Sequence, residues 1–150
     1  MKNHCTLVAL HLFFVIFVAQ AQEEAPPHVD NPADLVGLTL EELCSKFGLP
    51  RRVYAVRGQA SWQDDVVFVY PDMDCYIFED HVWQVGVQAA RGVRTGDQRA
   101  HIKEILGGET YDFDDGLLFK LPSGSWEMMM RINFDASGKA RAIFIYRSDM

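Results

Sequence analysis

The sequence is poor in cysteine and in positive charge, and it lacks a hydrophobic run long enough to cross a membrane. It has 3 Cys among 150 residues, and 14 basic residues against 21 acidic ones give a net charge of −7. An acidic protein repels phosphate backbones and anionic lipids, so we predict no nucleic-acid binding. The apolar run of residues 7–18 is shorter than the roughly 20 residues of a membrane-spanning helix. We therefore expect no stable membrane insertion of the mature chain.

Motifs of common enzyme classes are also missing. The sequence has no G-x-S-x-G motif, no phosphate-binding loop and no dinucleotide-binding glycine pattern. His81 follows Asp80 at a predicted turn and could act as a general base, but no motif places a Ser or Cys to partner it. Acidic residues before Gly116 and Gly138 resemble parts of calcium loops, and hairpin turns explain both. We predict no enzyme, no metal site and no cofactor; a hydrolase that uses His81 is the alternative.

The first 21 residues have the organisation of a secretory signal peptide. Lys2 supplies a positive charge, the apolar run follows, and Ala19 and Ala21 place small residues where a signal peptidase reads them. We predict cleavage after Ala21, and an uncleaved anchor is the alternative. Cleavage removes one basic residue and no acidic one, which leaves 13 basic and 21 acidic residues. The mature protein is expected to be periplasmic or secreted.

Two cysteines, Cys44 and Cys75, remain in the predicted mature chain. An even number of cysteines in an exported protein is typical of a disulfide bond. A bond between these residues would stabilise the fold by roughly 3–4 kcal/mol through loop closure. The alternative is two buried free thiols that pack as small apolar groups.

Residues 39–50 predict a short amphipathic helix with both ends marked. Thr39 and Glu42 have the spacing of a capping box, and Gly48 followed by Pro50 ends the helix. One face of this helix is apolar and comprises Leu40, Leu43, Cys44 and Phe47. Alternating β-branched and aromatic residues then predict strands at residues 52–56, 66–70, 75–78 and 82–88.

The same order of elements follows a second time, about 56 residues later. Thr95 and Gln98 form a second capping box, Gly107 ends the helix, and strands are predicted at 111–115, 116–121, 126–134 and 139–147. We therefore predict an α+β fold of two tandem repeats, each a short capped helix packed on a three- to four-stranded antiparallel meander. The repeats comprise residues 37–92 and 93–150, after a flexible acidic, proline-containing tether and helical turn at 22–36.

The first repeat contains Gly37-Leu-Thr-Leu-Glu-Glu-Leu43 and Phe47-Gly-Leu-Pro50, then Trp62, Tyr70 and a strand–turn–strand. This pattern resembles the SmpA/OmlA (BamE) outer-membrane assembly lipoproteins. The tandem arrangement over residues 37–147 resembles the β-lactamase inhibitor proteins, which double the same helix-plus-meander unit. The second repeat keeps the capped helix and Phe134-Asp-Ala-Ser-Gly-Lys139. The resemblance implies an envelope scaffold or a protein-binding module, with no catalytic activity.

Aromatic residues of the first repeat are the main functional candidates. If Cys75 points toward the helix, strand alternation directs Tyr76 and Phe78 to the other face of the sheet. The predicted partner-binding patch comprises Trp62, Tyr70, Tyr76 and Phe78. Alternatively, the two repeats fold over one another and bury these rings. We expect an exported module that binds a protein partner of unknown identity; a self-associating structural envelope protein is the alternative.

Overall fold

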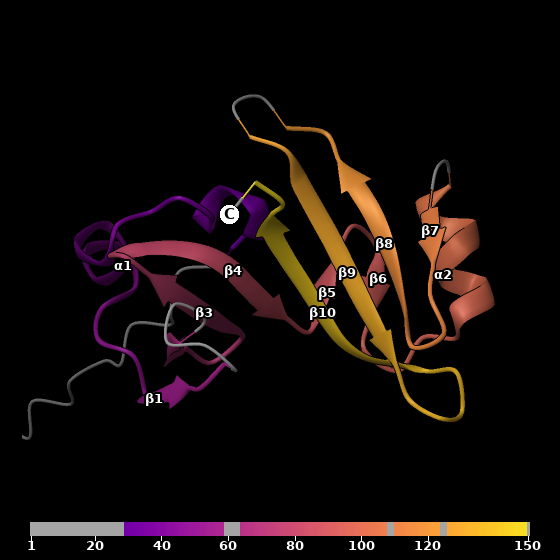
Figure 1. The fold of residues 1–150 in the computed structure, drawn as a ribbon, viewed down its shortest axis with the longest axis horizontal. Coiled ribbons are helices and arrows are strands. Elements are labelled where there is room, and N and C mark those ends of the chain that lie inside the picture. Colours follow the sequence, from indigo (N-terminus) through magenta and orange to yellow (C-terminus); the bar gives the residue numbers. More distant parts are fainter. Residues whose placement is uncertain (1–28, 59–63, 108–109, 124–125, 150) are drawn as a thin grey trace, which may run out of the picture.

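The computed structural model describes residues 29–58, 64–107, 110–123 and 126–149. The predicted signal peptide, its cleavage site after Ala21, most of the tether and Trp62 lie outside these residues. Three helical segments are described (Figure 1): the 3-10 turn η1 (Pro32–Leu35), α1 (Leu40–Phe47) and α2 (Arg99–Leu106). The strands are β1 (Arg52–Val56), β2 (Asp65–Val69), β3 (Met73–Phe78), β4 (His81–Val87), β5 (Ala89–Ala90), β6 (Val93–Arg94), β7 (Thr110–Asp112), β8 (Gly116–Leu121), β9 (Met128–Phe134) and β10 (Ala140–Arg147).

Helix α1 begins and ends as its sequence predicts. The Thr39 hydroxyl accepts a hydrogen bond from the Glu42 amide at 3.2 Å, and the Glu42 carboxylate accepts one from the Thr39 amide at 2.8 Å. Both amides would otherwise have no partner in the first turn, so the capping box satisfies two donors at once. Gly48 ends the helix with a positive φ of 72°. Leu43 is fully buried on the apolar face.

Helix α2 does not use the predicted capping box. Gln98 is the N-cap residue and makes no side-chain capping bond, while the Thr95 hydroxyl donates to the Gln88 side chain at 2.9 Å. The spacing of Thr95 and Gln98 matched a capping box, but the helix begins after Gln98 rather than at residue 96. This prediction was therefore wrong.

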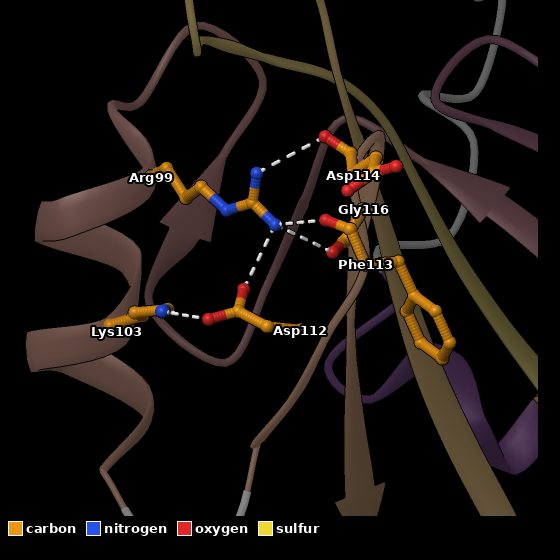
Figure 2. Close-up of polar contacts among 6 residues, drawn as sticks. All are labelled: Arg99, Lys103, Asp112, Phe113, Asp114 and Gly116. Carbon is orange, nitrogen blue, oxygen red and sulfur yellow. Dashed lines mark hydrogen bonds and ion pairs between the residues drawn. The ribbon is translucent and has the colours of Figure 1, made fainter.

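Contacts of Arg99 and Lys103 hold α2 against the β7–β8 turn instead (Figure 2). The Arg99 guanidinium donates to the Asp112 carboxylate at 2.9 Å and to the Gly116 carbonyl at 3.0 Å. It also donates to the carbonyls of Phe113 and Asp114, and Lys103 forms an ion pair with Asp112. One planar guanidinium with several donors can satisfy carbonyls that converge from a tight turn.

Eight of the ten described strands form one sheet, in the order β1-β2-β3-β4-β10-β9-β8-β7, with every neighbouring pair antiparallel. The prediction of two tandem helix-on-meander repeats is wrong. The junction is the pairing of β4 with β10, in which Val85 lies opposite Ile145. A meander of three or four strands has two exposed edges and a small core, so pairing β4 with β10 removes two edges and enlarges the buried layer.

One face of the sheet carries the hydrophobic core. A single row of opposed residues on this face crosses all eight strands: Val53, Phe68, Cys75, Val85, Ile145, Met130, Phe119 and Thr110. Leu35 of η1, Leu43 of α1 and Ile102 of α2 are fully buried in the same core cluster. The two α-helices therefore pack on one face, at opposite ends of the sheet (Figure 1).

A short hairpin, β5–β6, was not expected from the sequence. Its two turn residues, Arg91 and Gly92, have φ values of 54° and 83°. Positive φ at both central residues is the geometry of a tight two-residue hairpin turn. Val93 of this hairpin is fully buried and joins the core beside α2. The predicted boundary between residues 92 and 93 falls at this turn and stays a prediction.

Candidate functional site

The second face of the sheet, called the open face below, is not covered by any helix in the described part of the chain. Its side chains alternate with those of the core face, as the pleat of a strand requires. None of its aromatic side chains belongs to the core cluster or packs against it. One row of opposed residues on the open face is Tyr54, Val67, Tyr76, Gln84, Tyr146, Met129 and Lys120.

Four rings in the middle of the open face form an aromatic cluster, which comprises Tyr76, Trp83, Phe144 and Tyr146. Their centroids are 6.5 Å apart for Tyr76 and Trp83, 6.1 Å for Tyr76 and Phe144, and 6.4 Å for Trp83 and Tyr146. The interplanar angles of 71° to 77° place edges against faces. This geometry is favourable because a positive ring edge meets a negative ring face. All four rings are half-buried and present part of their surface to solvent.

An irregularity in β4 places Trp83 in this cluster. Tyr76 lies opposite Gln84, but the next residue, Ile77, lies opposite Val82, so Trp83 is an extra residue on its strand. Such a β-bulge redirects a side chain. Trp83 and Gln84 consequently both lie on the open face, although they are consecutive in the sequence.

Two carboxylates flank the aromatic cluster. The Trp83 indole donates to the Asp65 carboxylate at 2.9 Å, which fixes the ring and the acid together. Burial raises the pKa of Asp65 and of Asp74, although each also has a contact that lowers it. Burial is likewise the main cause that raises the pKa of Tyr76 to about 12, with a contribution from Tyr54. The open face thus combines an apolar aromatic centre with partly desolvated acids.

The structure places the predicted patch residues on different sides of the sheet. Tyr76 and Phe78 lie on the open face, as alternation predicted. Tyr70 belongs to the core instead: it is 6% exposed, its hydroxyl donates to the Gly48 carbonyl at 3.2 Å, and its ring lies 5.8 Å from that of Phe47. Trp62 lies outside the described residues. Of the three described patch residues, Tyr76 and Phe78 share the open face, and Tyr76 alone belongs to the aromatic cluster.

Sequence reasoning missed Trp83, Phe144 and Tyr146. A signal for the last two was present, because alternation in residues 143–146 places Ile143 and Ile145 on one face and the two aromatics on the other. No comparable signal identifies Trp83, since its position depends on the bulge. When a strand carries large apolar residues on both faces, each face is expected to pack against other apolar groups.

Cys44 and Cys75 are free thiols in the structure. Cys75 is fully buried on the core face, and burial raises its pKa to about 12. Cys44 is half-buried on α1. Both sulfurs contribute, after burial, to a raised pKa of Tyr70, so both lie near this one ring. The disulfide bond between them stays a prediction.

The remaining candidates lie elsewhere. His81 is exposed at the β3–β4 turn, with its Nδ1 2.9 Å from the Glu79 carbonyl. The Asp135 turn is a hairpin in which the carboxylate accepts bonds from the Ser137 and Lys139 amides, as the turn interpretation predicted. Among the described residues no group of three or more His, Cys, Asp or Glu could hold a metal. No helix in that part of the chain is long and apolar enough to span a bilayer.

A groove of about 450 Å³ lies on the core side of the sheet, between η1 and the β5–β6 hairpin. Its walls include Pro32, Ala33, Arg91, Arg94 and Leu121. The side chains of this groove are not organised around a buried polar group, because the described residues contain no buried polar or charged side chain. The groove therefore indicates a binding site less clearly than the open face does.

Comparison with known proteins gives a likeness of fold. No protein-family model and no curated protein matches the chain. The chain resembles an extracellular protein containing an SCP domain from Bacillus anthracis str. Ames, with a TM-score of 0.51 and 12% identity over 88% of this chain and 50% of that one. A cysteine-rich secretory protein from Staphylococcus aureus subsp. aureus Mu50 gives a TM-score of 0.48 and 16% identity over 83% and 48%.

The chain spans about half the length of these solved structures. At 12% identity the first likeness shows the fold alone. The expected kinship with BamE and the β-lactamase inhibitor proteins is wrong, because the fold likeness is to part of an SCP-domain protein and the strands form one sheet. The motifs behind that kinship were helix ends and turns, which are local features that unrelated folds share.

Proposed function

We propose that the chain is an exported, non-enzymatic module that binds a protein partner through the aromatic cluster of the open face. The observation that carries the proposal is the cluster itself: four half-buried rings in edge-to-face contact on a sheet face that no helix of the described residues covers. Aromatic residues dominate the binding energy of protein interfaces. Rings that already hold one another in place also lose little side-chain entropy on binding.

The charges around the cluster favour a partner with basic groups. Asp65 and Asp74 flank the rings, and their raised pKa values reflect incomplete solvation. A partner with Lys or Arg groups around an apolar centre would complement both parts of this surface. The whole chain is acidic, which would also speed the approach of a basic partner at low salt.

Export is supported by two observations. The N-terminal sequence has a basic residue, an apolar run and small residues at the predicted cleavage site. The solved structure with the similar fold is described as extracellular. Periplasmic or secreted localisation is therefore part of the proposal.

The test is a comparison of two single substitutions in a capture experiment from envelope or culture extract. Tyr76→Ser removes the ring that contacts both Trp83 and Phe144, and Ile105→Ser removes a 38% exposed apolar residue of α2 on the other side of the sheet. Capture of a basic partner should be lost with Tyr76→Ser and kept with Ile105→Ser, and it should weaken as salt rises.

Thermal unfolding of each variant controls for damage to the fold. The proposal expects Tyr76→Ser to remain folded, with a loss of about 1–2 kcal/mol because its ring is half-buried. A variant that stays folded and still captures the same partner would refute the proposal. Collapse of the fold would show that the ring belongs to the core, and Tyr146→Ser would then serve as the second test of the same surface.

A further inference from the structure

The two edges of the eight-stranded sheet differ in how they are protected. The β7 edge is three residues long, and its Asp112 is bound by Arg99 and Lys103 of α2 (Figure 2). The β1 edge is five residues long, and all five are exposed. β1 pairs with β2 on one side, and its other side has no strand partner among the described residues. An edge strand of this kind presents unpaired N–H and C=O groups to another strand.

Exposed apolar side chains are concentrated at the same edge. Nine large hydrophobic residues are exposed in the described part of the chain, and five of them lie on β1 or directly beside it: Leu49 (87%), Val53 (50%), Tyr54 (36%), Val56 (37%) and Val66 (42%). Val53 and Val66 lie on the core face and Tyr54 and Val56 on the open face, so this edge is apolar on both faces. The β1 edge therefore presents both unpaired backbone groups and exposed apolar side chains.

We propose that β1 pairs antiparallel with β1 of a second copy of the chain, around a twofold axis at Tyr54. In this register Tyr54 lies opposite its own counterpart, and Val53 lies opposite Ala55 of the second copy. A twofold contact must be self-complementary, and this strand is, because its central three residues are all uncharged. A shift by one residue would exchange the two faces of the strand, so the alternation of side chains excludes that register.

The charges at this edge are compatible with a second copy. Arg52 would lie opposite Val56 of the second copy, and Val56 lies opposite Asp65 in the β1–β2 pairing. A basic and an acidic side chain would thus share one row of the combined sheet, on the open face. The edge segment also carries Arg51 and Arg57, and this register places Arg51 opposite Arg57 of the second copy, where the Asp64 carboxylate balances the charge of Arg57. Its one described ion pair joins Arg57 and Asp64 at 2.7 Å.

The consequence is one continuous sheet with both open faces on the same side. An antiparallel pairing about a twofold axis perpendicular to the sheet keeps equivalent faces together. Two aromatic clusters would then face in one direction. Such a dimer could hold two partner molecules, or two sites on one partner, and would gain from avidity. The dimer itself does not depend on the proposed partner.

The experiment uses opposite charges at the twofold position. Tyr54→Lys alone and Tyr54→Glu alone each place like charges directly opposite one another, so each should weaken dimerisation about tenfold or more. An equimolar mixture of the two variants should restore a dimer, because the two substituted side chains attract. Tyr111→Lys on the β7 edge is the matched control, since Tyr111 is also an exposed edge tyrosine.

Sedimentation of the purified protein from about 1 μM to 1 mM measures the outcome, the range in which weak protein contacts form. The wild type and Tyr111→Lys should dimerise, the two single Tyr54 variants should be largely monomeric at the same concentrations, and circular dichroism should show all four folded. A wild type that stays monomeric throughout would overturn the proposal. So would a dimer unaffected by either Tyr54 variant, or a mixture that fails to associate.

Discussion

The ring of Phe144 on β10 lies against Gly86 of the neighbouring strand β4. The two residues are opposite one another in the β4–β10 pairing. A Cβ atom at residue 86 would be 3.4 Å from the Phe144 Cε1 atom and 3.5 Å from its Cδ1 atom. The missing side chain of Gly86 therefore leaves the space in which the ring packs, and the aromatic cluster extends across the junction of the two halves of the sheet.

Substitution of Gly86 tests this packing. Gly86→Ala adds one methyl at ordinary contact distance and removes the conformational cost of glycine in a strand, so the free energy of unfolding should stay constant or rise by about 0.5–1 kcal/mol. Gly86→Ile must displace the ring and should lower that free energy by about 1–3 kcal/mol. Urea unfolding measures both. Equal effects of the two substitutions would show that Phe144 does not lie on Gly86.

The pH dependence of stability should differ in sign between two carboxylates. Burial raises the pKa of Asp74 in the folded state, so its charge costs stability above that pKa, and the cost disappears as the pH falls through it. Asp74→Asn should therefore raise Tm at pH 7 and change it little near pH 3. Hydrogen bonds from Lys103 and Arg99 lower the pKa of Asp112. Its negative charge therefore stabilises the folded protein above the ordinary carboxyl pKa, and this stabilisation is lost as the pH falls through the pKa of the folded state.

Asp112→Asn is the matched control for that measurement. It should lower Tm at pH 7, and its difference from the wild type should shrink as the pH falls. Thermal unfolding of the three proteins between pH 3 and pH 8 compares them. The same sign for both variants at pH 7 would contradict the assignment of a desolvated acid to the open face.

The Arg99 contacts should dominate the attachment of α2. Arg99→Met leaves the carbonyls of the β7–β8 turn without their donor and removes a guanidinium that lies 4.9 Å from the Phe134 ring centroid. We expect a loss of about 2 kcal/mol in the free energy of unfolding. Lys103→Met removes a single exposed ion pair and should cost clearly less. Hydrogen exchange of the α2 amides should accelerate in the first variant; similar losses for both would refute the role of Arg99.

Thiol reactivity distinguishes the two states of the cysteines. As free thiols, Cys44 should react with a small alkylating reagent in the folded protein, while Cys75 should react only on unfolding because it is buried and its pKa is about 12. Mass spectrometry after alkylation, without reductant, counts the modified residues. If neither cysteine reacts even in denaturant, the bond between Cys44 and Cys75 that the sequence predicts is present.

Features that depend on neighbouring residues could be predicted from the sequence. The capping box of Thr39 and Glu42 and the helix end at Gly48 lie within ten residues, so their geometry is decided locally. The predicted strands of the sheet also overlap the observed ones, although residues 113–115 lie in the β7–β8 turn and the β5–β6 hairpin was not predicted. The prediction of a capping box at Thr95 failed because the start of α2 is positioned by the contacts of Arg99 with distant residues instead.

Features that depend on distant residues could not be predicted. The pairing of Val85 with Ile145 joins positions far apart in the chain, and no local pattern specifies it. The order of elements therefore led to a prediction of two separate repeats, whereas the observed sheet continues from one to the other. Tyr70 was assigned to the binding patch with the other aromatic residues of the first repeat, yet the chain turns at that residue and directs its ring into the core. Trp83 depends on a bulge that only the partner strand reveals.

The most direct test of the account is site-specific photo-cross-linking from the open face. A photoreactive phenylalanine analogue in place of Tyr146 lies within the aromatic cluster, and the same analogue in place of Ile105 lies on α2. In extract of the compartment where the protein resides, the first position should cross-link a single basic partner, and excess unlabelled wild type should suppress the product. Cross-links to that partner from Ile105 alone, or equally from both positions, would contradict a binding surface on the open face.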